Sequence, residues 1–177
     1  MSTDIVFTLT GTDRVGVVQE VTSILLDLDA NVETSRMVRL GGEFAVLMLL
    51  CLPEENVARI DDAFKGLTAQ GYRVTTSPTD KNANATRADW LVYRIEVQGA
   101  DHEGIIHEVS QGLARLGVTI ESVETTTTDA PMSGTPLFSM TGTIAIPPTL
   151  ADEDWAAALA SAGQAAGVDV SATALEA

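Results

Sequence analysis

The chain of 177 residues has a single cysteine, few aromatic residues and few basic residues. One thiol cannot form an internal disulfide, so we expect the protein to work in a reducing compartment. The 25 acidic and 10 basic side chains give a net charge of −15. Because this charge repels polyanions, we expect no direct contact with nucleic acid and no anionic membrane partner. The simplest role of the negative charge is to keep the protein soluble.

Long hydrophobic runs are also missing. The longest, from Phe44 to Leu52, is about half the length that a membrane-spanning helix needs. The first residues, MSTDIVFTLT, lack a basic segment and alternate like a strand, so we expect no signal peptide and a cytoplasmic location. Cys51 lies in the apolar run, which favours a buried, unreactive thiol over a catalytic one.

The chain contains an internal sequence repeat. The segment TGTDRVGVVQEV at residues 10–21 returns as QGADHEGIIHEV at residues 98–109. An offset of 88 residues aligns the glycines, the aspartates and the leucines that follow, without a gap from Phe7 to Glu33. This repeat predicts two copies of one structural unit.

The first copy predicts the order strand, helix, strand, strand, helix, strand. Residues 4–10 alternate as a strand, and strands are also expected at residues 32–40, 43–52 and 72–77, with a hairpin turn at Gly41 and Gly42. We expect strand 43–52 to be buried on both faces. Pro53 is expected to open the second helix and Gly71 to end it. The expected inward residues are Val18, Val21, Leu25 and Leu28 of the first helix, flanked by Val17 and Ile24, and Val57, Ile60, Phe64 and Leu67 of the second.

The second copy repeats this order. Strands are expected at residues 90–98, 118–128, 137–146 and 168–172, and the first helix should face inward through Ile106, Val109, Leu113 and Leu116. Thr149 with Asp152 resembles a capping box that opens the last helix, and Gly167 ends it. Trp155, Leu159 and Ala162 should face inward from that helix.

The order β-α-β-β-α-β predicts an α+β fold, a ferredoxin-like sandwich with both helices on one face of an antiparallel sheet. We predict two such domains, at residues 1–78 and 89–177. The linker, residues 79–88, is rich in turn-forming residues and has no periodicity.

The repeated loop has features of a ligand site. Gly11 and Gly99 end a strand, where glycine permits a positive φ or the close approach of a second backbone. Gly16 and Gly104 open a helix, whose free N–H groups can accept a carboxylate. Asp13 and Asp101 can take an ammonium group, so loop and helix together suit an amino acid. The alternative is that each aspartate only caps its helix or turn.

At these residues the sequence resembles the ACT domain, taken twice. GTDRVGVV with NVE at residues 31–33, and GADHEGII with TIE at residues 119–121, are similar to the family's loop and second strand. The segment TTTTDAPMSGTPLF resembles tandem ACT proteins related to the glycine cleavage system transcriptional repressor. The resemblance covers nearly the whole chain.

The resemblance implies a regulatory protein that binds a small amino acid between two ACT domains, with no catalytic residue, metal or other cofactor. The ligand-binding residues that it implies are Gly11, Thr12, Asp13, Gly16 and Asn31 in the first copy, and Gly99, Asp101, Gly104 and Thr119 in the second. Thr119 in place of Asn31, and His102 in place of Arg14, depart from the pattern, so the two sites are expected to differ.

Several functions remain open at this stage. The leading hypothesis is a non-enzymatic regulator that responds to glycine or serine and acts through a regulatory protein partner, as the resemblance suggests for transcription of glycine metabolism. A second is a pure protein-interaction module with a vestigial ligand site. A third, an acylphosphatase-like enzyme, is disfavoured because Asp13 would repel phosphate. The sequence leaves open whether the chain is a monomer or a homodimer.

Overall fold

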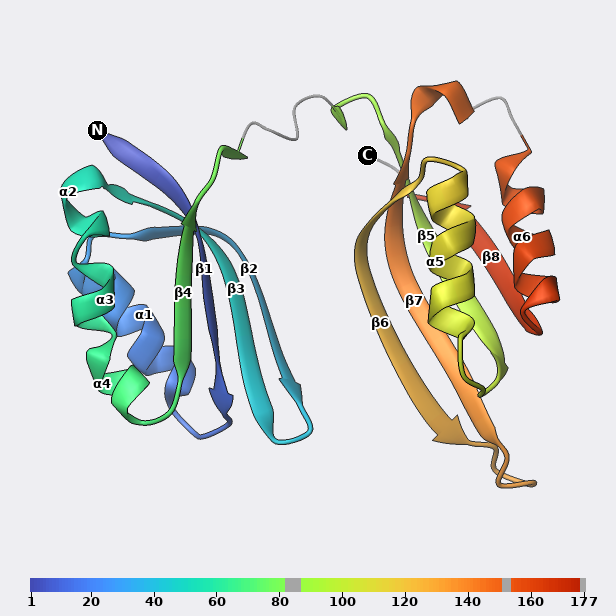
Figure 1. Cartoon of the computed structure of the whole chain (residues 1–177), viewed down its shortest axis with the longest axis horizontal. Helices are drawn as coiled ribbons and strands as arrows, with labels where there is room; N and C mark the ends of the chain where they lie inside the picture. Colours follow the sequence, from blue (N-terminus) through green and yellow to red (C-terminus); the bar gives the residue numbers. More distant parts are fainter. Residues whose placement is uncertain (82–86, 151–153, 176–177) are drawn as a thin grey trace. The chain divides into compact units, whose positions relative to one another are not determined.

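The computed structural model describes residues 1–81, 87–150 and 154–175. The chain divides into two compact units, Met1–Ala83 and Asn84–Ala177, which we call unit 1 and unit 2. In each unit, helices cover one face of a four-stranded antiparallel sheet (Figure 1). The predicted pair of ferredoxin-like units is confirmed.

Unit 1 places its first and third strands at the centre of the sheet, in the order β2-β3-β1-β4. Its elements are β1 Ser2–Thr12, α1 Val17–Asp27, β2 Asn31–Leu40, β3 Glu43–Pro53, α2 Glu54–Val57, α3 Ile60–Ala63, α4 Lys65–Ala69 and β4 Arg73–Pro78. The turn at Gly41 and Gly42 is confirmed, and both glycines have positive φ.

Unit 2 has the equivalent sheet order, β6-β7-β5-β8. Its elements are β5 Leu91–Ala100, α5 Ile105–Arg115, β6 Thr119–Asp129, β7 Pro136–Ile146, a 3₁₀ turn at Pro148–Leu150, α6 Trp155–Ala165 and β8 Val168–Ala174.

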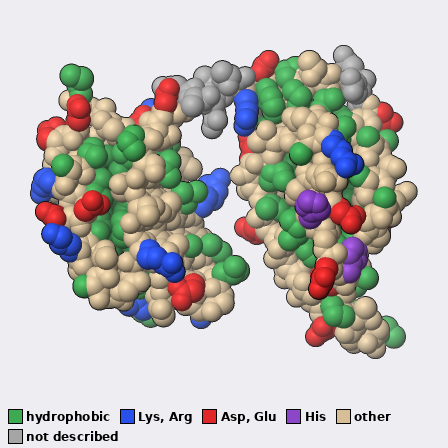
Figure 2. All heavy atoms as spheres, in the orientation of Figure 1, with side chains coloured by type: hydrophobic (Ala, Val, Ile, Leu, Met, Phe, Trp, Pro, Cys, Tyr) green, Lys and Arg blue, Asp and Glu red, His purple; other side chains and the backbone are tan. Residues whose placement is uncertain are grey.

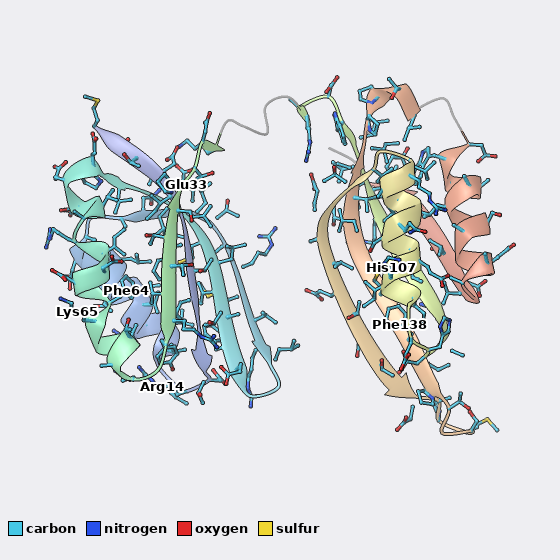
Figure 3. All side chains as sticks on the ribbon, viewed as in Figure 1. Arg14, Glu33, Phe64, Lys65, His107 and Phe138 are labelled. Atoms are coloured by element: carbon cyan, nitrogen blue, oxygen red, sulfur yellow. The ribbon has the colours of Figure 1, made fainter. Side chains whose placement is uncertain are left out.

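Each unit has its own hydrophobic core between its sheet and its helices. In unit 1, Phe7 of β1 packs against Phe64, with ring centroids 4.9 Å apart. Figure 3 labels Phe64 on the helical side of the sheet. In unit 2, Tyr93 of β5 meets the edge of Trp155 at the same separation. Burial of these faces supplies most of the free energy that holds each unit together.

The prediction that β3 is buried on both faces is wrong. Its residues alternate, with Val46, Met48 and Leu50 buried while Leu47 is 48% exposed. Helices cover only one face of the sheet, so the other face stays open. Cys51 lies on the open face and is half-buried, not buried as predicted.

The inward face of the first helix in each unit differs from the prediction by one residue. Val17 and Ile105 are buried, whereas Val18 and Ile106 are 38% and 48% exposed. The buried residues run 17, 21, 25 in α1 and 105, 109, 113 in α5. Both sets have helical spacing, so the way the helix meets the sheet decides which of two adjacent apolar residues faces the core.

The second helix of unit 1 also differs from the prediction. It consists of three short segments, α2, α3 and α4 (Figure 1), although Ile60, Phe64 and Leu67 are buried as expected and Val57 is partly buried. The Arg59 N–H donates to the Asn56 carbonyl three residues back, so the chain turns more tightly there than in an α-helix.

The last helix begins later than predicted. Asp154 caps α6 by accepting a hydrogen bond from the Ala157 N–H at 3.3 Å. Asp152 of the expected capping box lies outside the described residues. Trp155 and Leu159 are buried as expected, while Ala162 is half-buried and Gly163 is buried.

Within the described residues, the structure has no helix that is both long enough and apolar enough to cross a membrane.

Candidate functional site

Helices α1 and α5 begin without a side-chain cap. Each starts at a glycine with positive φ, Gly16 at 90° and Gly104 at 98°. No side chain caps either helix, so the partial positive charge of the first turn is available to an anion. The prediction that Gly16 and Gly104 open helices is confirmed.

Gly11 and Gly99 are needed for space, and the expectation of a positive φ at these positions is wrong. A Cβ on Gly11 would lie 2.5 Å from the Tyr72 ring, and one on Gly99 would lie 2.7 Å from a Val168 methyl. In each unit the atom nearest to the glycine belongs to a side chain at or just before the start of the last strand, Tyr72 or Val168. That part of the chain passes directly beside the end of β1 or β5.

The two aspartates of the loop differ in their surroundings. The Asp13 carboxylate lies 2.9 Å from Nε of Arg39, and its side chain is 29% exposed. Asp101 is exposed, and no ion pair to it occurs within the described residues. Neither aspartate caps its helix, since Gly16 and Gly104 hold the N-cap positions. The alternative that these side chains cap their helices is therefore wrong, while the alternative that they cap a turn stays a prediction.

Arg14 ties the loop of unit 1 to the end of the second helix. Its guanidinium pairs with Glu20, donates to Gln70 at 3.1 Å and lies 5.6 Å from the centre of the Tyr72 ring (Figure 3 labels Arg14). The hydrogen bond that Arg14 donates to the Glu20 carboxylate raises the pKa of Arg14 above its ordinary value. Arg14 thus holds the loop in place through one of its terminal nitrogens, while its Nε has no hydrogen-bond partner in the described structure.

His102 makes the equivalent connection in unit 2. Its Nε2 lies 2.8 Å from the Ala166 carbonyl, and its Nδ1 lies 3.0 Å from the Glu103 carbonyl. These hydrogen bonds raise the pKa of His102 above 6.5, and Glu108 and Asp101 add to the shift. Both histidines are exposed on the surface of unit 2 (Figure 2).

The expected site residues form two groups in each unit. Asn31 of β2 is paired with Cys51 of β3, which is paired with Asp4 of β1. Asn31 therefore lies at the same end of the sheet as the start of β1. Gly11, seven residues further along β1, lies at the other end of the sheet. At about 3.3 Å per residue, the two ends are about 23 Å apart. One unit alone therefore does not bring Asn31 to the loop of Thr12, Asp13 and Gly16.

The same separation holds in unit 2. Thr119 is paired with Ala145 near the start of β5, whereas Gly99 is paired with Phe138 at its end. Gly99 helps to line a hollow of about 360 Å³ together with Asp169. In unit 1, a hollow of about 400 Å³ lies between α1 and the start of β2, lined by Ala30 and Val32 on either side of Asn31.

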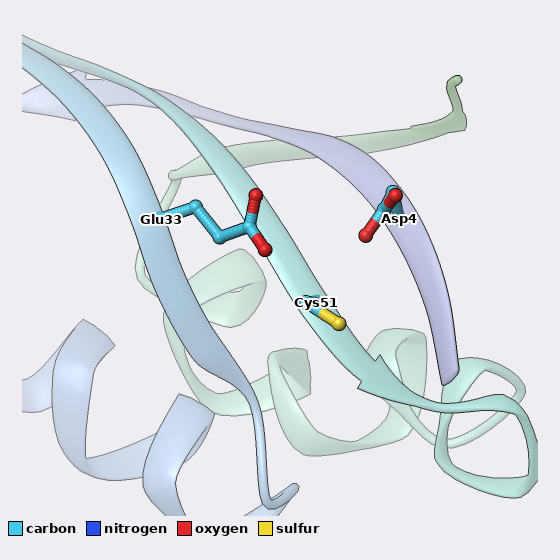
Figure 4. A group of neighbouring side chains, drawn as sticks. All are labelled: Asp4, Glu33 and Cys51. Carbon is cyan, nitrogen blue, oxygen red and sulfur yellow. The ribbon is translucent and has the colours of Figure 1, made fainter. Parts of the chain in front are cut away.

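A third group of side chains lies on the open face of unit 1 (Figure 4). Asp4, Glu33 and Cys51 place possible metal-ligand atoms within 4.8 Å of one another. The Lys81 ammonium lies 2.7 Å from Glu33 and 3.6 Å from Asp4, in the place where a cation would bind. The group therefore forms an internal salt bridge that fastens the chain after β4 to the sheet.

Sequence reasoning missed Arg39 and Tyr72, which contact the loop from distant parts of the chain. The signal for Arg39 was present in the hairpin. With the turn fixed at Gly41 and Gly42, Arg39 must pair with Phe44, which pairs with Gly11. Tyr72 donates to the Thr12 carbonyl at 2.7 Å, and only the packing of β4 against β1 reveals that contact.

The comparisons with known proteins agree with this geometry. The ACT domain family model matches residues 3–72. The crystal structure of an unknown protein from Galdieria sulphuraria is 32% identical, covers 99% of this chain and 100% of its own, and has a TM-score of 0.85. That of a proposed glycine cleavage system transcriptional repressor is 20% identical, covers 100% of this chain and 99% of its own, and has a TM-score of 0.74. No curated protein sequence matches.

The chain belongs to the ACT domain family and carries the ACT fold twice in tandem. At 20% identity, its likeness to the proposed repressor is a likeness of fold.

Proposed function

We propose that the chain is a non-enzymatic regulator that binds a small amino acid and acts through contact with a partner protein. One observation carries this proposal: both units leave the start of their first helix uncapped, beside an aspartate in the preceding loop. An uncapped helix start binds a carboxylate, and an aspartate binds an ammonium group. The two charges match those of a free amino acid.

The separation of Asn31 from the loop supports a site that two units build together. Because the two groups are about 23 Å apart within a unit, the loop of one unit must meet the second strand of another unit. The site then lies between two ACT domains, with Gly11, Thr12, Asp13 and Gly16 on one side and Asn31 on the other. In the second copy, Gly99, Asp101 and Gly104 form the loop side, and Thr119 forms the strand side.

The ligand of the first site has to displace Arg39 from Asp13. The pair is partly exposed, and exposed ion pairs contribute little free energy. The ammonium group of an amino acid can therefore take the place of the Arg39 guanidinium beside Asp13 at low cost. Asp101 has no such competitor in the described structure, so the two sites are expected to differ in affinity.

Thermal unfolding with each of the twenty amino acids tests this function. At a ligand concentration a hundred times its Kd, binding stabilises the folded state by about 2.7 kcal/mol. We expect glycine or serine at millimolar concentration to raise the Tm by several degrees. No shift with any amino acid would contradict the proposal.

The second candidate is an interaction module whose ligand site is vestigial, and the Asp13–Arg39 ion pair favours it, because a residue of the chain already holds the carboxylate. Asp13→Ala separates the two candidates. If the chain is an amino-acid sensor, this variant no longer responds to the amino acid. If it is an interaction module, neither the wild type nor the variant responds, and the variant still binds its partner. Asp61→Ala, at an exposed position on α3, is the matched control.

The glycine cleavage system is the process that we propose for this regulation, because the chain shares its fold over its full length with the proposed repressor. A reporter driven by a glycine-inducible promoter, with and without the chain, tests that assignment independently of the ligand.

A further inference from the structure

The open faces of the two sheets, which the helices do not cover, have different chemistry at equivalent positions. In unit 1 the centre of this face is apolar. Leu47 is 48% exposed and Val38 is 52% exposed. Three more apolar residues lie on the same face and are half-buried: Val6, Ala45 and Leu49. Their place on this face follows from strand pairing, because Val6 is paired with Leu49 and Ala45 is paired with Val38.

Unit 2 carries polar residues at the same positions. The register matches Leu47, opposite Thr8, with Thr141, opposite Glu96. By the same register, the counterparts of Val6, Val38, Ala45 and Leu49 are Arg94, Thr126, Ser139 and Thr143.

Charge is also inverted between the two faces. Arg36, opposite Leu47, is replaced by Glu124, opposite Thr141. Arg73, opposite Thr10, is replaced by Asp169, opposite Gln98. All four side chains are exposed, and none of them forms a salt bridge within the described residues.

The other end of each face carries acidic residues in both units. Near the start of β1, unit 1 carries Asp4 and Glu33, whose two charges Lys81 only half neutralises. Near the start of β5, unit 2 carries Arg94, but the repeat also places Glu121 at the position of Glu33, in an equivalent bulge. The two faces are therefore complementary in charge at the end of the strands where Arg36 and Arg73 correspond to Glu124 and Asp169.

We propose that the open face of unit 1 docks onto the open face of unit 2 in a second copy of this chain. Two copies can satisfy both pairs of faces at once, which gives a closed dimer with two equivalent contacts. A chain of net charge −15 repels its own copies at long range. Association therefore requires a local complement, and Arg36 and Arg73 facing Glu124 and Asp169 supply it.

The size of the faces is sufficient. Four strands about 4.8 Å apart and seven residues long at about 3.3 Å per residue cover about 400 Å². Each contact hides such a face on both partners, and the dimer has two contacts, so about 1,600 Å² is buried in total. Stable interfaces bury about 1,200–2,000 Å².

Sedimentation velocity of the full chain over a range of protein concentrations tests the dimer. We expect a monomer–dimer equilibrium that shifts towards dimer as the protein concentration is raised. The double variant Arg36→Glu, Arg73→Glu should weaken the dimer by about tenfold or more. The double variant Glu124→Arg, Asp169→Arg should weaken it equally. An equimolar mixture of the two variants should restore association through both contacts, because one contact then has swapped charges and the other has the wild-type residues.

Apolar and control variants complete the test. Leu47→Thr with Leu49→Thr gives unit 1 the residues of unit 2, keeps good strand formers and should weaken the dimer without unfolding. Arg87→Glu with Arg115→Glu makes the same change in net charge as Arg36→Glu with Arg73→Glu, but away from both faces. It should leave the dissociation constant of the dimer unchanged. A wild-type chain that stays monomeric at all concentrations, or a charge-reversed mixture that does not associate, overturns the proposal. Neither result bears on amino-acid binding.

Discussion

Arg14 and His102 occupy equivalent positions and make equivalent connections by different chemistry. Arg14 reaches the side chains of Glu20 and Gln70, whereas His102 reaches two backbone carbonyls. A neutral imidazole has one N–H, so it donates to only one of those carbonyls, while the protonated ring donates to both. The connection in unit 2 therefore depends on pH near neutrality.

The pH dependence of His102 has a definite sign. Its folded pKa is raised above 6.5, first by the hydrogen bond to Glu103 and then by that to Ala166. A raised pKa means that its contribution to stability is complete below pH 6.5 and is lost as pH rises through the folded pKa. We expect the stability difference between wild type and His102→Ala to be largest at acidic pH and to shrink above neutrality, as measured by urea unfolding at several pH values.

His107→Ala is the control, because His107 is exposed on α5 and forms no hydrogen bond in the described structure (Figure 3). An NMR titration should place the His102 midpoint above 6.5. A stability difference that is independent of pH would contradict this account.

The three longest helices begin in two different ways. Helices α1 and α5 start at glycine without a side-chain cap, whereas α6 starts at Asp154, whose carboxylate accepts the Ala157 N–H. Only the uncapped helices follow the repeated loop. A cap would occupy the N–H groups that a ligand carboxylate needs, so the difference agrees with the proposed site.

The cap on α6 gives a prediction for this element. Asp154→Ala should destabilise unit 2 by about 1 kcal/mol, because the Ala157 N–H loses its acceptor. Asp154→Asn keeps an acceptor oxygen and should retain most of the stability. Chemical denaturation monitored by circular dichroism measures both variants, and equal losses in the two would show that the cap bond is unimportant.

At the scale of the whole molecule, the chain has two separate hydrophobic cores. Leu50 and Ile144 hold equivalent central positions in β3 and β7, and each is 0% exposed. They belong to different clusters, so the loss of one leaves the packing of the other core intact.

Matched truncations test this independence. Leu50→Ala and Ile144→Ala should each destabilise their own unit by about 2–5 kcal/mol. Hydrogen exchange followed by mass spectrometry, at a dilution where the chain is monomeric, should show lost protection only in the unit that carries the change. Lost protection in both units from a single substitution would show that the units unfold together.

The sequence by itself determined the duplication, the order of strands and helices, the hairpin turn and the glycines that start two helices. These features follow from local periodicity and from the steric limits of single residues, which operate within a few residues of the chain. The choice of Val17 over Val18 as a core residue already depended on where the helix meets the sheet.

Only the tertiary structure decided which face of each sheet the helices cover. It therefore decided that Cys51 is half-buried and that Leu47 is exposed. It also placed Asn31 at the opposite end of the sheet from the loop and brought Arg39 to Asp13. Strand register and layer packing join residues far apart in the sequence, so no local pattern contains these contacts.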